Sequence, residues 1–455
     1  MAPKGLAFPS GTTIEYFSEV FKMRFSDSAQ ALVMNFLNEI ASEHPSAISF
    51  AAGRPLNDFF SRLGPDKLAD ALDQFERHNI TGKNNRRKYR DQLLQYGSAA
   101  GIINDIFATQ LRTDEDVPAA AQRLLTTAGC QEALALCLSA LCSAASDVLL
   151  VRNPTYVGAT GAAYALNISV FPLSNQVPTI SEAIVEAVGE LVKSGRRPKA
   201  LYLIPDFDNP TGETISKSER EQIINVCLEH RIVILEDNPY GMFRYEGDRI
   251  APIAALDGGG CVVYLSTFSK TLSPALRVGA AVIPMKLFGD ELAARELYKE
   301  LVQRKSFLTL NTSQISQAIV GGILIDQGGS LREWTKPMTD RYRANRDSML
   351  DALSARRDIL PPEVTWNYPQ GGFFLSVNVP FRFDHDTVRQ CALKSKVIVM
   401  PMAFFALDTS YDTSLRLAFS SVETEEIYTG INALSHFIAE HSSIHPSSNI
   451  QAMLN

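Results

Sequence analysis

The chain has 455 residues, of which 45% are hydrophobic and 20% are charged, and its net charge is -7. These values are typical of a globular protein of roughly two to three domains. An acidic chain with a pI near 5.6 gives no electrostatic footprint for nucleic acid. Its one basic cluster, residues 83–90, is interrupted by polar residues and is predicted to be a solvated loop.

The six cysteines show no C-x-x-C pair and fall mostly inside apolar segments, as buried free thiols do in a reducing compartment. The histidines show no ligand-like spacing, so no metal site is expected. The N-terminal residues lack the basic-then-apolar run of a signal peptide, and no apolar stretch reaches the ~18 residues of a membrane helix. A cytoplasmic protein without a membrane partner is therefore expected.

In chain order, residues 28–43 have helical spacing, and residues 47–50 are predicted to form a short strand that enters a glycine turn. In this turn Gly53 lets the backbone approach a ligand closely, and Arg54 is either a surface charge or a cation that faces substrate. Further helices are predicted over residues 65–75, 89–96 and 100–111.

A predicted strand over residues 123–127 runs into Gly129, Cys130 and Gln131 and then directly into a helix over residues 132–141. This order directs free backbone N–H groups and the positive end of the helix dipole at one point, which suits an anion such as phosphate. Many turns of this shape bind nothing, so the turn alone does not identify a site.

Strands and helices continue to alternate, which predicts a mostly parallel sheet with helices on both faces. In such sheets ligands collect outside the carboxyl ends of the strands. Tyr156 follows one such end and is either a ring that stacks on a planar ligand or a core tyrosine. The strands are predicted over residues 147–151, 168–172 and 199–204, and a helix over residues 180–193.

Two further strand ends carry polar side chains. A proline-rich loop after residue 204 has Asn209 at its centre, and the buried strand over residues 231–237 ends in Asp237, with Tyr240 three residues on. An unpaired buried carboxylate is costly, so Asp237 needs a partner, for which a cationic ring nitrogen is suitable.

The strand that begins at Val262 ends in a hydroxyl-rich turn with a single lysine. Thr267, Ser269 and Arg277 are suited to hold a phosphate, and the amine of Lys270 can form a Schiff base with a carbonyl. Taken alone, a solvated lysine in a polar connection is the commoner meaning of such a turn.

The remaining elements are a helical region and then an α+β pattern. Helices are predicted over residues 291–302, 311–328, 331–353, 386–394 and 424–440, strands over residues 364–367, 371–377, 397–400 and 415–419, and a mobile tail over residues 441–455.

Together these points meet the needs of pyridoxal 5′-phosphate: a lysine, an acid for the ring nitrogen, donors to the phenolic oxygen, a stacking ring and an anion cradle. From about residue 25 to residue 440 the chain resembles the class I/II aminotransferases of fold type I, and most of all the kynurenine/2-aminoadipate aminotransferase group. The motifs that carry the resemblance are Thr267-Phe-Ser-Lys270 with Arg277, Asn209-Pro-Thr-Gly212, Asp237-Asn-Pro-Tyr240, Gly129-Cys-Gln131, Pro154-Thr-Tyr156, Leu94-Gln-Tyr-Gly97 and Arg416-Leu-Ala-Phe-Ser420.

The resemblance implies a role for each of these residues. Lys270 becomes the Schiff-base lysine and proton shuttle, Asp237 the partner of the ring nitrogen, and Tyr156 the ring that stacks on the cofactor. Arg416 becomes a bidentate fork for the substrate α-carboxylate. The resemblance implies that the phosphate is held by Gly129, Cys130, Gln131, Thr267, Ser269 and Arg277 of one subunit and by Tyr96 of the other. It implies that the phenolic oxygen accepts hydrogen bonds from Asn209 and Tyr240. The substrate is expected to meet Gly53, Arg54 and Asn209 as well as Arg416.

The resemblance also implies an aspartate-aminotransferase-like α/β fold in a homodimer with active sites at the subunit interface. The expected parts are an N-terminal arm with part of the small domain (residues 1–70), a large cofactor-binding domain (71–340) and a C-terminal small domain (341–455). The implied activity moves an amino group between an L-amino acid and a 2-oxo acid.

Two other functions are compatible with part of this pattern. The first is a pyridoxal-phosphate-dependent decarboxylase, lyase, replacement enzyme or oxidative deaminase of a specialised biosynthetic pathway, because the same site supports several outcomes. The second is a regulator with an aminotransferase-like sensing domain. It would need a helix-turn-helix ahead of this domain, for which about 25 residues are too few.

Four residues depart from the family's pattern. Cys130 stands where serine is usual, which weakens a donor to phosphate, and Asp208 replaces glutamine and adds a negative charge near the cofactor. Met402 replaces glycine and should stiffen its loop. Arg54 stands where apolar or small residues are usual and, if it faces substrate, favours a carboxylate-bearing side chain.

Overall fold

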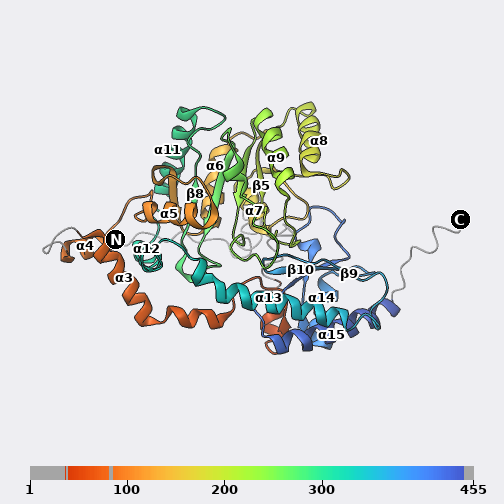
Figure 1. The fold of residues 1–455 in the computed structure, drawn as a ribbon. Helices are drawn as coiled ribbons and strands as arrows, with labels where there is room; N and C mark the ends of the chain where they lie inside the picture. Colours follow the sequence, from red (N-terminus) through yellow and green to blue (C-terminus); the bar gives the residue numbers. More distant parts are fainter. Residues whose placement is uncertain (1–35, 37–38, 81–85, 445–455) are drawn as a thin grey trace, which may run out of the picture.

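The computed structural model describes residue 36 and residues 39–80 and 86–444. In these ranges the chain forms a large α/β part and a smaller α+β part. The long helix α13 (Arg332–Ser354) runs from one part to the other along the lower side of the molecule in Figure 1. The predicted boundaries near residues 70 and 340 stay predictions.

The large part is built on a seven-stranded sheet with the order β2-β8-β7-β6-β5-β3-β4. Its strands are parallel except for β8, which is antiparallel to both β2 and β7. The predicted mostly parallel sheet is therefore confirmed. The strands are β2 (Leu124–Thr127), β3 (Asp147–Val151), β4 (Ser169–Pro172), β5 (Arg197–Leu203), β6 (Val233–Asp237), β7 (Val262–Thr267) and β8 (Gly279–Val282).

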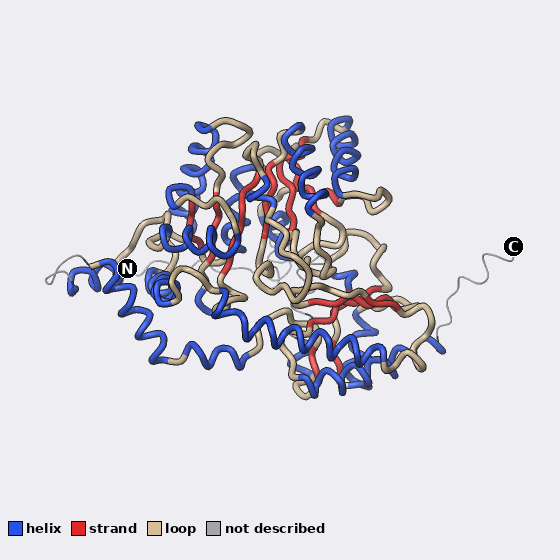
Figure 2. The backbone as a smooth tube through the Cα atoms, viewed as in Figure 1, coloured by secondary structure: helices blue, strands red, loops and turns tan. Residues whose placement is uncertain are grey.

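Helices cover both faces of this sheet, which is why the central strands are continuous apolar runs. Leu149 and Leu235 pack with α6 and α7 in one core, whereas Leu150 and Leu201 pack with α8 and α9 in another. Figure 2 shows the strands as a layer between these helices. The helices are α5 (Asn104–Glu115), α6 (Cys130–Leu141), α7 (Val157–Ala165), α8 (Ile180–Lys193), α9 (Lys217–Glu229), α10 (Ile253–Leu256), α11 (Glu291–Leu308) and α12 (Gln314–Asp326).

Side-chain caps fix where several of these helices begin. Thr179, Ser216 and Ser313 each accept a hydrogen bond from a backbone N–H in the first turn of α8, α9 and α12. Helix α6 begins differently. Its N-cap is Gly129, which has no side chain to cap the helix, so the first N–H groups of α6 can serve a ligand.

The smaller part holds a four-stranded antiparallel sheet, β12-β13-β10-β9, and a parallel pair, β1-β11. The prediction of one strand over residues 397–400 is wrong, because the segment divides between the two sheets. Its first half pairs with β1 and its second half with β13. The elements are β1 (Ile48–Ser49), β9 (Thr365–Trp366), β10 (Phe374–Asn378), β11 (Val397–Ile398), β12 (Met400–Pro401), β13 (Ser414–Ala418), α14 (His385–Ser395) and α15 (Thr424–Ile444).

Two predicted irregular segments are helical. Residues 86–90 belong to α4 (Arg86–Leu93), where Tyr89 packs near Phe75 and Arg90 Nε lies 2.9 Å from Glu76 Oε2. These contacts with α3 (Pro65–Asn79) order a segment whose polar sequence predicts a loop. Residues 441–444 continue α15, so the tail prediction is wrong there, and residues 445–455 lie outside the described ranges.

Short elements complete the chain. Of the helix predicted over residues 28–43, residue 36 and residues 39–43 are helical, and the others lie outside the described residues. No helix within the described ranges is long and apolar enough to cross a membrane. The 3-10 segments are η1 (Asn57–Leu63), η2 (Ala121–Arg123), η3 (Pro274–Leu276) and η4 (Met402–Phe404).

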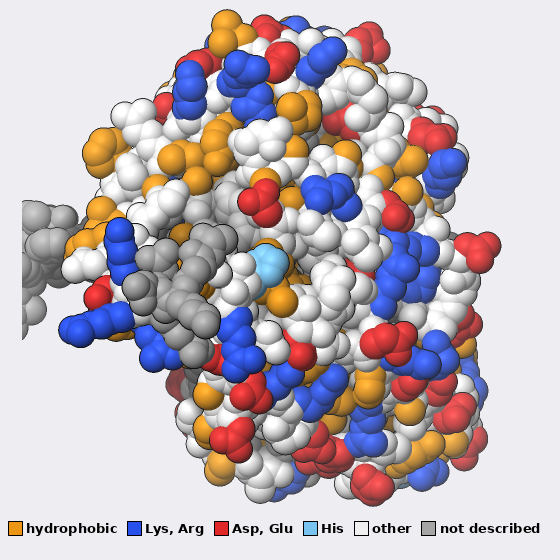
Figure 3. Space-filling model, turned by 60° about the vertical axis from the view of Figure 1, so that its left-hand side comes forward, with side chains coloured by type: hydrophobic (Ala, Val, Ile, Leu, Met, Phe, Trp, Pro, Cys, Tyr) orange, Lys and Arg blue, Asp and Glu red, His pale blue; other side chains and the backbone are white. Residues whose placement is uncertain are grey.

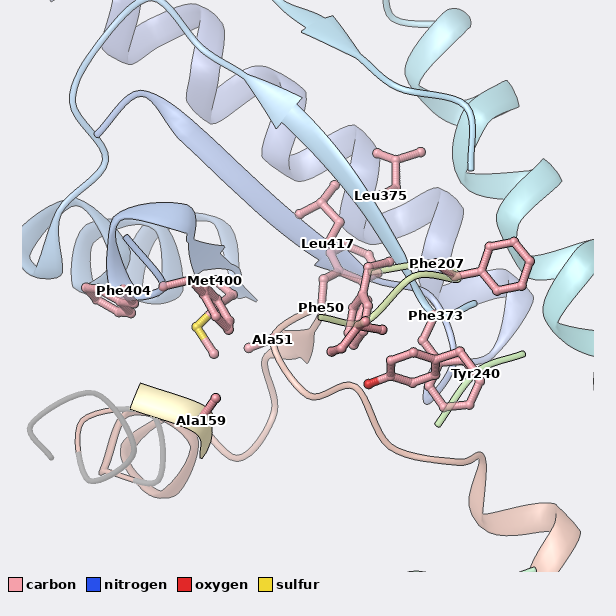
Figure 4. Close-up of a cluster of buried hydrophobic side chains, with 14 of the residues drawn as sticks. Phe50, Ala51, Ala159, Phe207, Tyr240, Phe373, Leu375, Met400, Phe404 and Leu417 are labelled. Carbon is pink, nitrogen blue, oxygen red and sulfur yellow. The ribbon is translucent and has the colours of Figure 1, made fainter. Parts of the chain in front are cut away.

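One aromatic cluster joins the large and small parts. Tyr240, which follows β6, packs against Phe373, which precedes β10, with 5.1 Å between ring centroids (Figure 4). Both rings belong to the same buried core as Phe50 and Phe207. Outside this core, charged side chains of both signs are interspersed on the face shown in Figure 3. The junction of the two parts is thus apolar, and the site described next opens beside it.

Candidate active site

A cavity of about 680 Å³ opens at the carboxyl edge of the parallel strands, and both parts of the molecule line it. Of the residues predicted for the site, only Gly129 and Tyr96 are outside the lining. Gly129 adjoins it as the N-cap of α6, whereas Tyr96 is 80% exposed at the end of the segment after α4. The predicted residues that line the cavity are Gly53, Arg54, Cys130, Gln131, Tyr156, Asn209, Asp237, Tyr240, Thr267, Ser269, Lys270, Arg277 and Arg416.

The reversed strand β8 brings Arg277 to this edge. Gly279, the first residue of β8, lies opposite Thr127 and Thr267, which are the last residues of β2 and β7. Because β8 enters the sheet at the edge where its neighbours leave it, Arg277 reaches the turns that follow both strands.

Arg277 joins the glycine turn to the hydroxyl turn. Its Nη2 donates to the carbonyl of Ala128 at 2.9 Å, and its Nη1 lies 3.5 Å from Ser269 Oγ, which accepts a hydrogen bond from Thr267 Oγ1. Gly129 has a φ of 85°, and a Cβ at this position would lie 2.5 Å from Arg277 Nη2. Glycine is therefore required for the guanidinium to reach the helix N-terminus.

Asp237 is buried, and both of its oxygens accept hydrogen bonds. Tyr202 Oη donates to Oδ2 at 2.7 Å, and Cys130 Sγ donates to Oδ1 at 3.1 Å. Burial raises the pKa of Asp237, while the hydrogen bonds from Tyr202 and Cys130 and the charge of Lys270 oppose the rise. Tyr202 was not predicted, although its register opposite Leu235 puts it on the same face as Asp237.

Lys270 is half-buried, and its Nζ donates to the carbonyl of Gly53 at 3.0 Å. Burial and the nearby charge of Arg416 lower the pKa of the amine to about 8, against the opposing effect of Asp237. A neutral amine is a nucleophile and a base, so Lys270 is suited to act near neutral pH.

Arg416 lies between two aromatic rings, with its Cζ 4.4 Å from the ring centroid of Phe374 and 4.7 Å from that of Phe405. It donates to Asn209 Oδ1 at 2.7 Å and also to the carbonyl of Ala51. Its Nε is buried and has no hydrogen-bond partner among the described residues. A buried guanidinium without a carboxylate is a suitable receptor for an anionic ligand.

Tyr156 lines the same cavity, and burial raises its pKa to about 12. The amide of Gln131 donates to the carbonyl of Gly158 at 2.7 Å, which turns this side chain toward α7. Tyr240 is buried and its ring meets the ring of Phe374 edge-on, with 5.5 Å between the centroids. Both phenols stay protonated and can donate hydrogen bonds into the cavity.

The segment from Ala51 to Arg54 is held by the small part. Ser420 Oγ donates to the carbonyl of Arg54 at 2.8 Å, and Ser421 Oγ donates to that of Ala52 at 2.9 Å. The Arg54 side chain is exposed and lines the cavity. It is therefore placed at the rim rather than in the interior.

Two of the other departures from the family pattern, Asp208 and Met402, lie away from the cavity wall. Asp208 accepts a hydrogen bond from Thr211 Oγ1 at 2.9 Å and lies 4.0 Å from Arg152 Nη1. Burial raises the pKa of Asp208 to about 6. Met402 is buried in η4, whereas Met400 and Phe405 are the residues of this region that line the cavity. In the described ranges no cluster of His, Cys, Asp and Glu is arranged to hold a metal ion.

The residues present fit pyridoxal 5′-phosphate. The donors around Arg277 and the uncapped start of α6 suit its phosphate, and the glycine at 129 leaves the space that a Cβ would fill. The buried carboxylate and the lysine amine face the same cavity. This fold and this set of side chains define an aspartate-aminotransferase-like enzyme.

The sequence model of the family described as aminotransferase class I and II matches residues 56–434, and the chain belongs to this family. (S)-3,5-dihydroxyphenylglycine transaminase of Amycolatopsis orientalis is 37% identical over 411 residues, which are 89% of this chain and 91% of that protein. Aromatic-amino-acid aminotransferase 1 of Thermococcus litoralis is 29% identical over 426 residues, or 92% and 95% of the two chains.

Solved structures show the same relationship. The crystal structure of Pyrococcus horikoshii kynurenine aminotransferase in complex with PMP has a TM-score of 0.77 and 27% identity, and the match covers 94% of this chain and 98% of that one. The predicted fold, and the predicted class I/II aminotransferase with its resemblance to the kynurenine aminotransferase group, are confirmed.

Proposed function

We propose that the chain is a pyridoxal-phosphate-dependent aminotransferase that moves an amino group between an L-amino acid and a 2-oxo acid. The observation that carries the proposal is the meeting of Lys270, Asp237 and Arg416 in one cavity. A nucleophilic amine, a carboxylate for a ring nitrogen and a cation for a substrate carboxylate are what this chemistry requires.

The cofactor would be held at its phosphate by Thr267, Ser269, Arg277 and the turn from Gly129 to Gln131. Asn209 and Tyr240 would donate to its phenolic oxygen, and Tyr156 would cover one face of its ring. Pyridoxal 5′-phosphate supplies an aldehyde that takes up the amino group and a conjugated ring that accepts the electrons released at Cα.

The protein side chains supply the proton transfers. Asp237, as a carboxylate, would favour the protonated form of the cofactor's ring nitrogen, on which the ring's capacity to accept electrons depends. With the cofactor bound, Lys270 Nζ would be the base that takes the proton from the substrate Cα and the acid that gives it back. Asp237 is buried and Lys270 is half-buried, which limits the access of water to these groups.

Arg416 would bind the α-carboxylate, because it lines the cavity and forms no ion pair with a carboxylate among the described residues. Apolar side chains contribute to the cavity wall, among them Leu134, Ile398 and Met400. That wall, together with two relatives whose names specify dihydroxyphenylglycine and aromatic amino acids, supports an aromatic substrate.

Arg54 at the rim supports a second substrate class in the same site. An aminotransferase must also accept the partner that returns or removes the amino group. An exposed guanidinium at the mouth is suited to the side-chain carboxylate of an acidic partner such as 2-oxoglutarate.

We also propose a homodimer. Two nearby segments carry exposed apolar side chains, namely Leu94 and Tyr96 in one and Phe307, Leu308 and Leu310 in the other. The amide of Gln314, at the start of α12, donates to the carbonyl of Gln92 and so holds the two segments near each other. Exposed apolar side chains grouped in this way mark a protein interface. Tyr96 would reach the phosphate site of the partner.

Six free cysteines, five of them buried, support a cytoplasmic location.

An amino-donor screen tests the function. The holoenzyme is mixed with aromatic donors or with glutamate and 2-aminoadipate, with 2-oxoglutarate as acceptor, and products are measured by mass. We expect one 2-oxo acid for each amino group transferred, and loss of turnover and of the cofactor's visible band in Lys270→Ala. Release of carbon dioxide or ammonia in place of transfer would instead support the decarboxylase, lyase or deaminase alternative.

The same screen tests Arg54. In Arg54→Ala we expect KM for acidic substrates to rise by roughly tenfold, as loss of one charged contact predicts, and KM for aromatic donors to stay within about twofold. An equal loss for both classes would reject a role in side-chain recognition.

A further inference from the structure

We propose that Tyr202 and Cys130 are positioning residues that hold the Asp237 carboxylate in the orientation and charge state in which it serves the ring nitrogen of the cofactor. This inference rests on the proposed function and deepens it, because it assigns the Tyr202 phenol and the Cys130 thiol to Asp237, whereas the turn from Gly129 to Gln131 would meet the phosphate through its backbone N–H groups.

The geometry is two-sided. Tyr202 lies on β5, is 1% exposed, and donates to Oδ2 at 2.7 Å. Cys130 is the first residue of α6 and donates to Oδ1 at 3.1 Å. The two donors come from separate elements and reach separate oxygens, so together they fix the plane of the carboxylate.

A carboxylate oxygen offers about two acceptor positions, so one donor on each oxygen leaves further positions free. Since Tyr202 and Cys130 occupy one position each, the remaining ones are left for a donor in the cavity. A ring N–H is such a donor. The side chain of Asp237 therefore does not have to rotate to meet it.

The same two hydrogen bonds favour the charged form of Asp237. The carboxylate is buried, which raises its pKa, and the bonds from Tyr202 and Cys130 lower it again. Lys270 faces it from the turn after β7 and adds a favourable charge. Tyr156 and Tyr240 are the other titratable groups near it, and both keep their protons because burial raises their pKa values.

This placement gives a different meaning to the cysteine at position 130. From the sequence, a cysteine in place of the usual serine is expected to be a weaker donor to phosphate. In the structure the thiol bonds to Asp237, while Thr267 and Arg277 make contact with Ser269. The thiol is a weak donor and the phenol a stronger one, so we expect Tyr202 to contribute more than Cys130.

The test compares Tyr202→Phe and Cys130→Ala with the wild-type holoenzyme. Loss of a donor raises the pKa of Asp237, so the carboxylate is lost at a higher pH and the acidic limb of the kcat profile moves upward. We expect a shift of about one pH unit and a fall in kcat of about tenfold at neutral pH for Tyr202→Phe. We expect a smaller shift for Cys130→Ala, and KM for the amino donor to stay within about twofold.

Tyr264→Phe is the matched control. Tyr264 is also a buried tyrosine of the same sheet, but its hydroxyl bonds to Glu115 and Asn238. This variant should lose stability without a shift of the acidic limb. Cys130→Ser keeps a donor to Asp237, and its acidic limb should lie at a lower pH than that of Cys130→Ala.

The inference is overturned if Tyr202→Phe keeps the wild-type acidic limb and kcat, or if Tyr264→Phe shifts the limb equally. Either result would leave the proposed function standing, because the wild-type enzyme would still transfer amino groups. Failure of the wild-type protein to bind pyridoxal phosphate or to transaminate would instead reject the proposed function itself, before any variant is compared.

Discussion

The environment of Lys270 predicts how the reactivity of its amine depends on pH. Burial and the like charge of Arg416 lower the pKa of its amine from 10.5 to about 8, and Asp237 only partly offsets them. Before the chain binds its cofactor, more of this amine is therefore neutral near pH 7 than in a lysine with the ordinary pKa.

We expect the rate at which pyridoxal phosphate attaches to the cofactor-free chain to rise with pH and level off above about pH 8. In Arg416→Met the plateau should move to higher pH, because a like charge that disfavours the ammonium form is gone. The rate is followed by visible absorption, and Arg382→Met, which changes an exposed arginine, is the control. A wild-type rate that still climbs to pH 10.5 would contradict this expectation.

At the scale of residues, sequence motifs predicted the groups that lie close together along the chain, such as Thr267, Ser269 and Lys270. Local chain geometry alone joins them. The contacts of Lys270 with the carbonyl of Gly53 and of Arg416 with that of Ala51 could not be predicted. They join positions 217 and 365 residues apart, and their acceptors are backbone atoms that no residue type reveals.

At the scale of elements, helix α11 is tied to the turn that begins α6. Glu132 Oε2 accepts a hydrogen bond from the backbone N–H of Ala128 at 2.6 Å and pairs with the buried amine of Lys305 at 2.8 Å. Thr309 Oγ1 donates to Glu132 Oε1 at 2.6 Å. The peptide groups of Ala128 are thus fixed on one side by Glu132 and on the other by Arg277.

Glu132→Gln should weaken cofactor binding, because Ala128 loses its charged acceptor and the turn loosens. We expect the dissociation constant of pyridoxal phosphate to rise by about tenfold, with kcat at saturating cofactor within about twofold. Removing one member of a buried pair costs about 3–5 kcal/mol, so Tm should fall as well. Thr309→Val, which leaves the bond to Ala128 intact, is the control. A lower Tm with unchanged cofactor affinity would contradict the expected effect on the turn.

Helix α8 (Ile180–Lys193), which has an amphipathic pattern and a cap, was predicted to the residue. The pattern fails where burial is uniform. Helix α7 (Val157–Ala165) consists of small apolar residues and gives no periodic signal, and the run from Val397 to Met400 does not reveal where its partner sheet changes. In both cases tertiary contacts decide the structure.

At the scale of the whole molecule, the apolar side chains around Tyr96 and Leu308 are exposed to solvent in a single chain, which is unfavourable unless a partner covers them. These side chains are 80% and 68% exposed. The group lies on the side of α11 and α12, which is turned forward in Figure 3, where hydrophobic side chains stand among charged ones. A second copy would cover it.

Leu308→Asp should shift the protein from dimer to monomer and abolish activity, because a charge in an apolar interface is not solvated. Tyr96→Phe should keep the dimer and raise the dissociation constant of pyridoxal phosphate by about tenfold, through loss of one hydrogen bond to phosphate. Light scattering coupled to size-exclusion chromatography measures the mass. A wild-type monomer with full activity would reject the dimer, and Val192→Asp, on an exposed face of α8, is the control.

The division of the segment from Val397 to Pro401 between two sheets has a consequence for substrate range. Through Val397 and Ile398 the segment is in register with β1, just ahead of Ala51, and through Met400 it is in register with Arg416. One short, continuous stretch of backbone therefore spans these two sides of the cavity. Because consecutive Cα atoms are about 3.8 Å apart, this stretch fixes the distance between them. Ile398 and Met400 line the space between them. Exchange of these two side chains can alter which amino acid fits while the anchor for its carboxylate keeps its place.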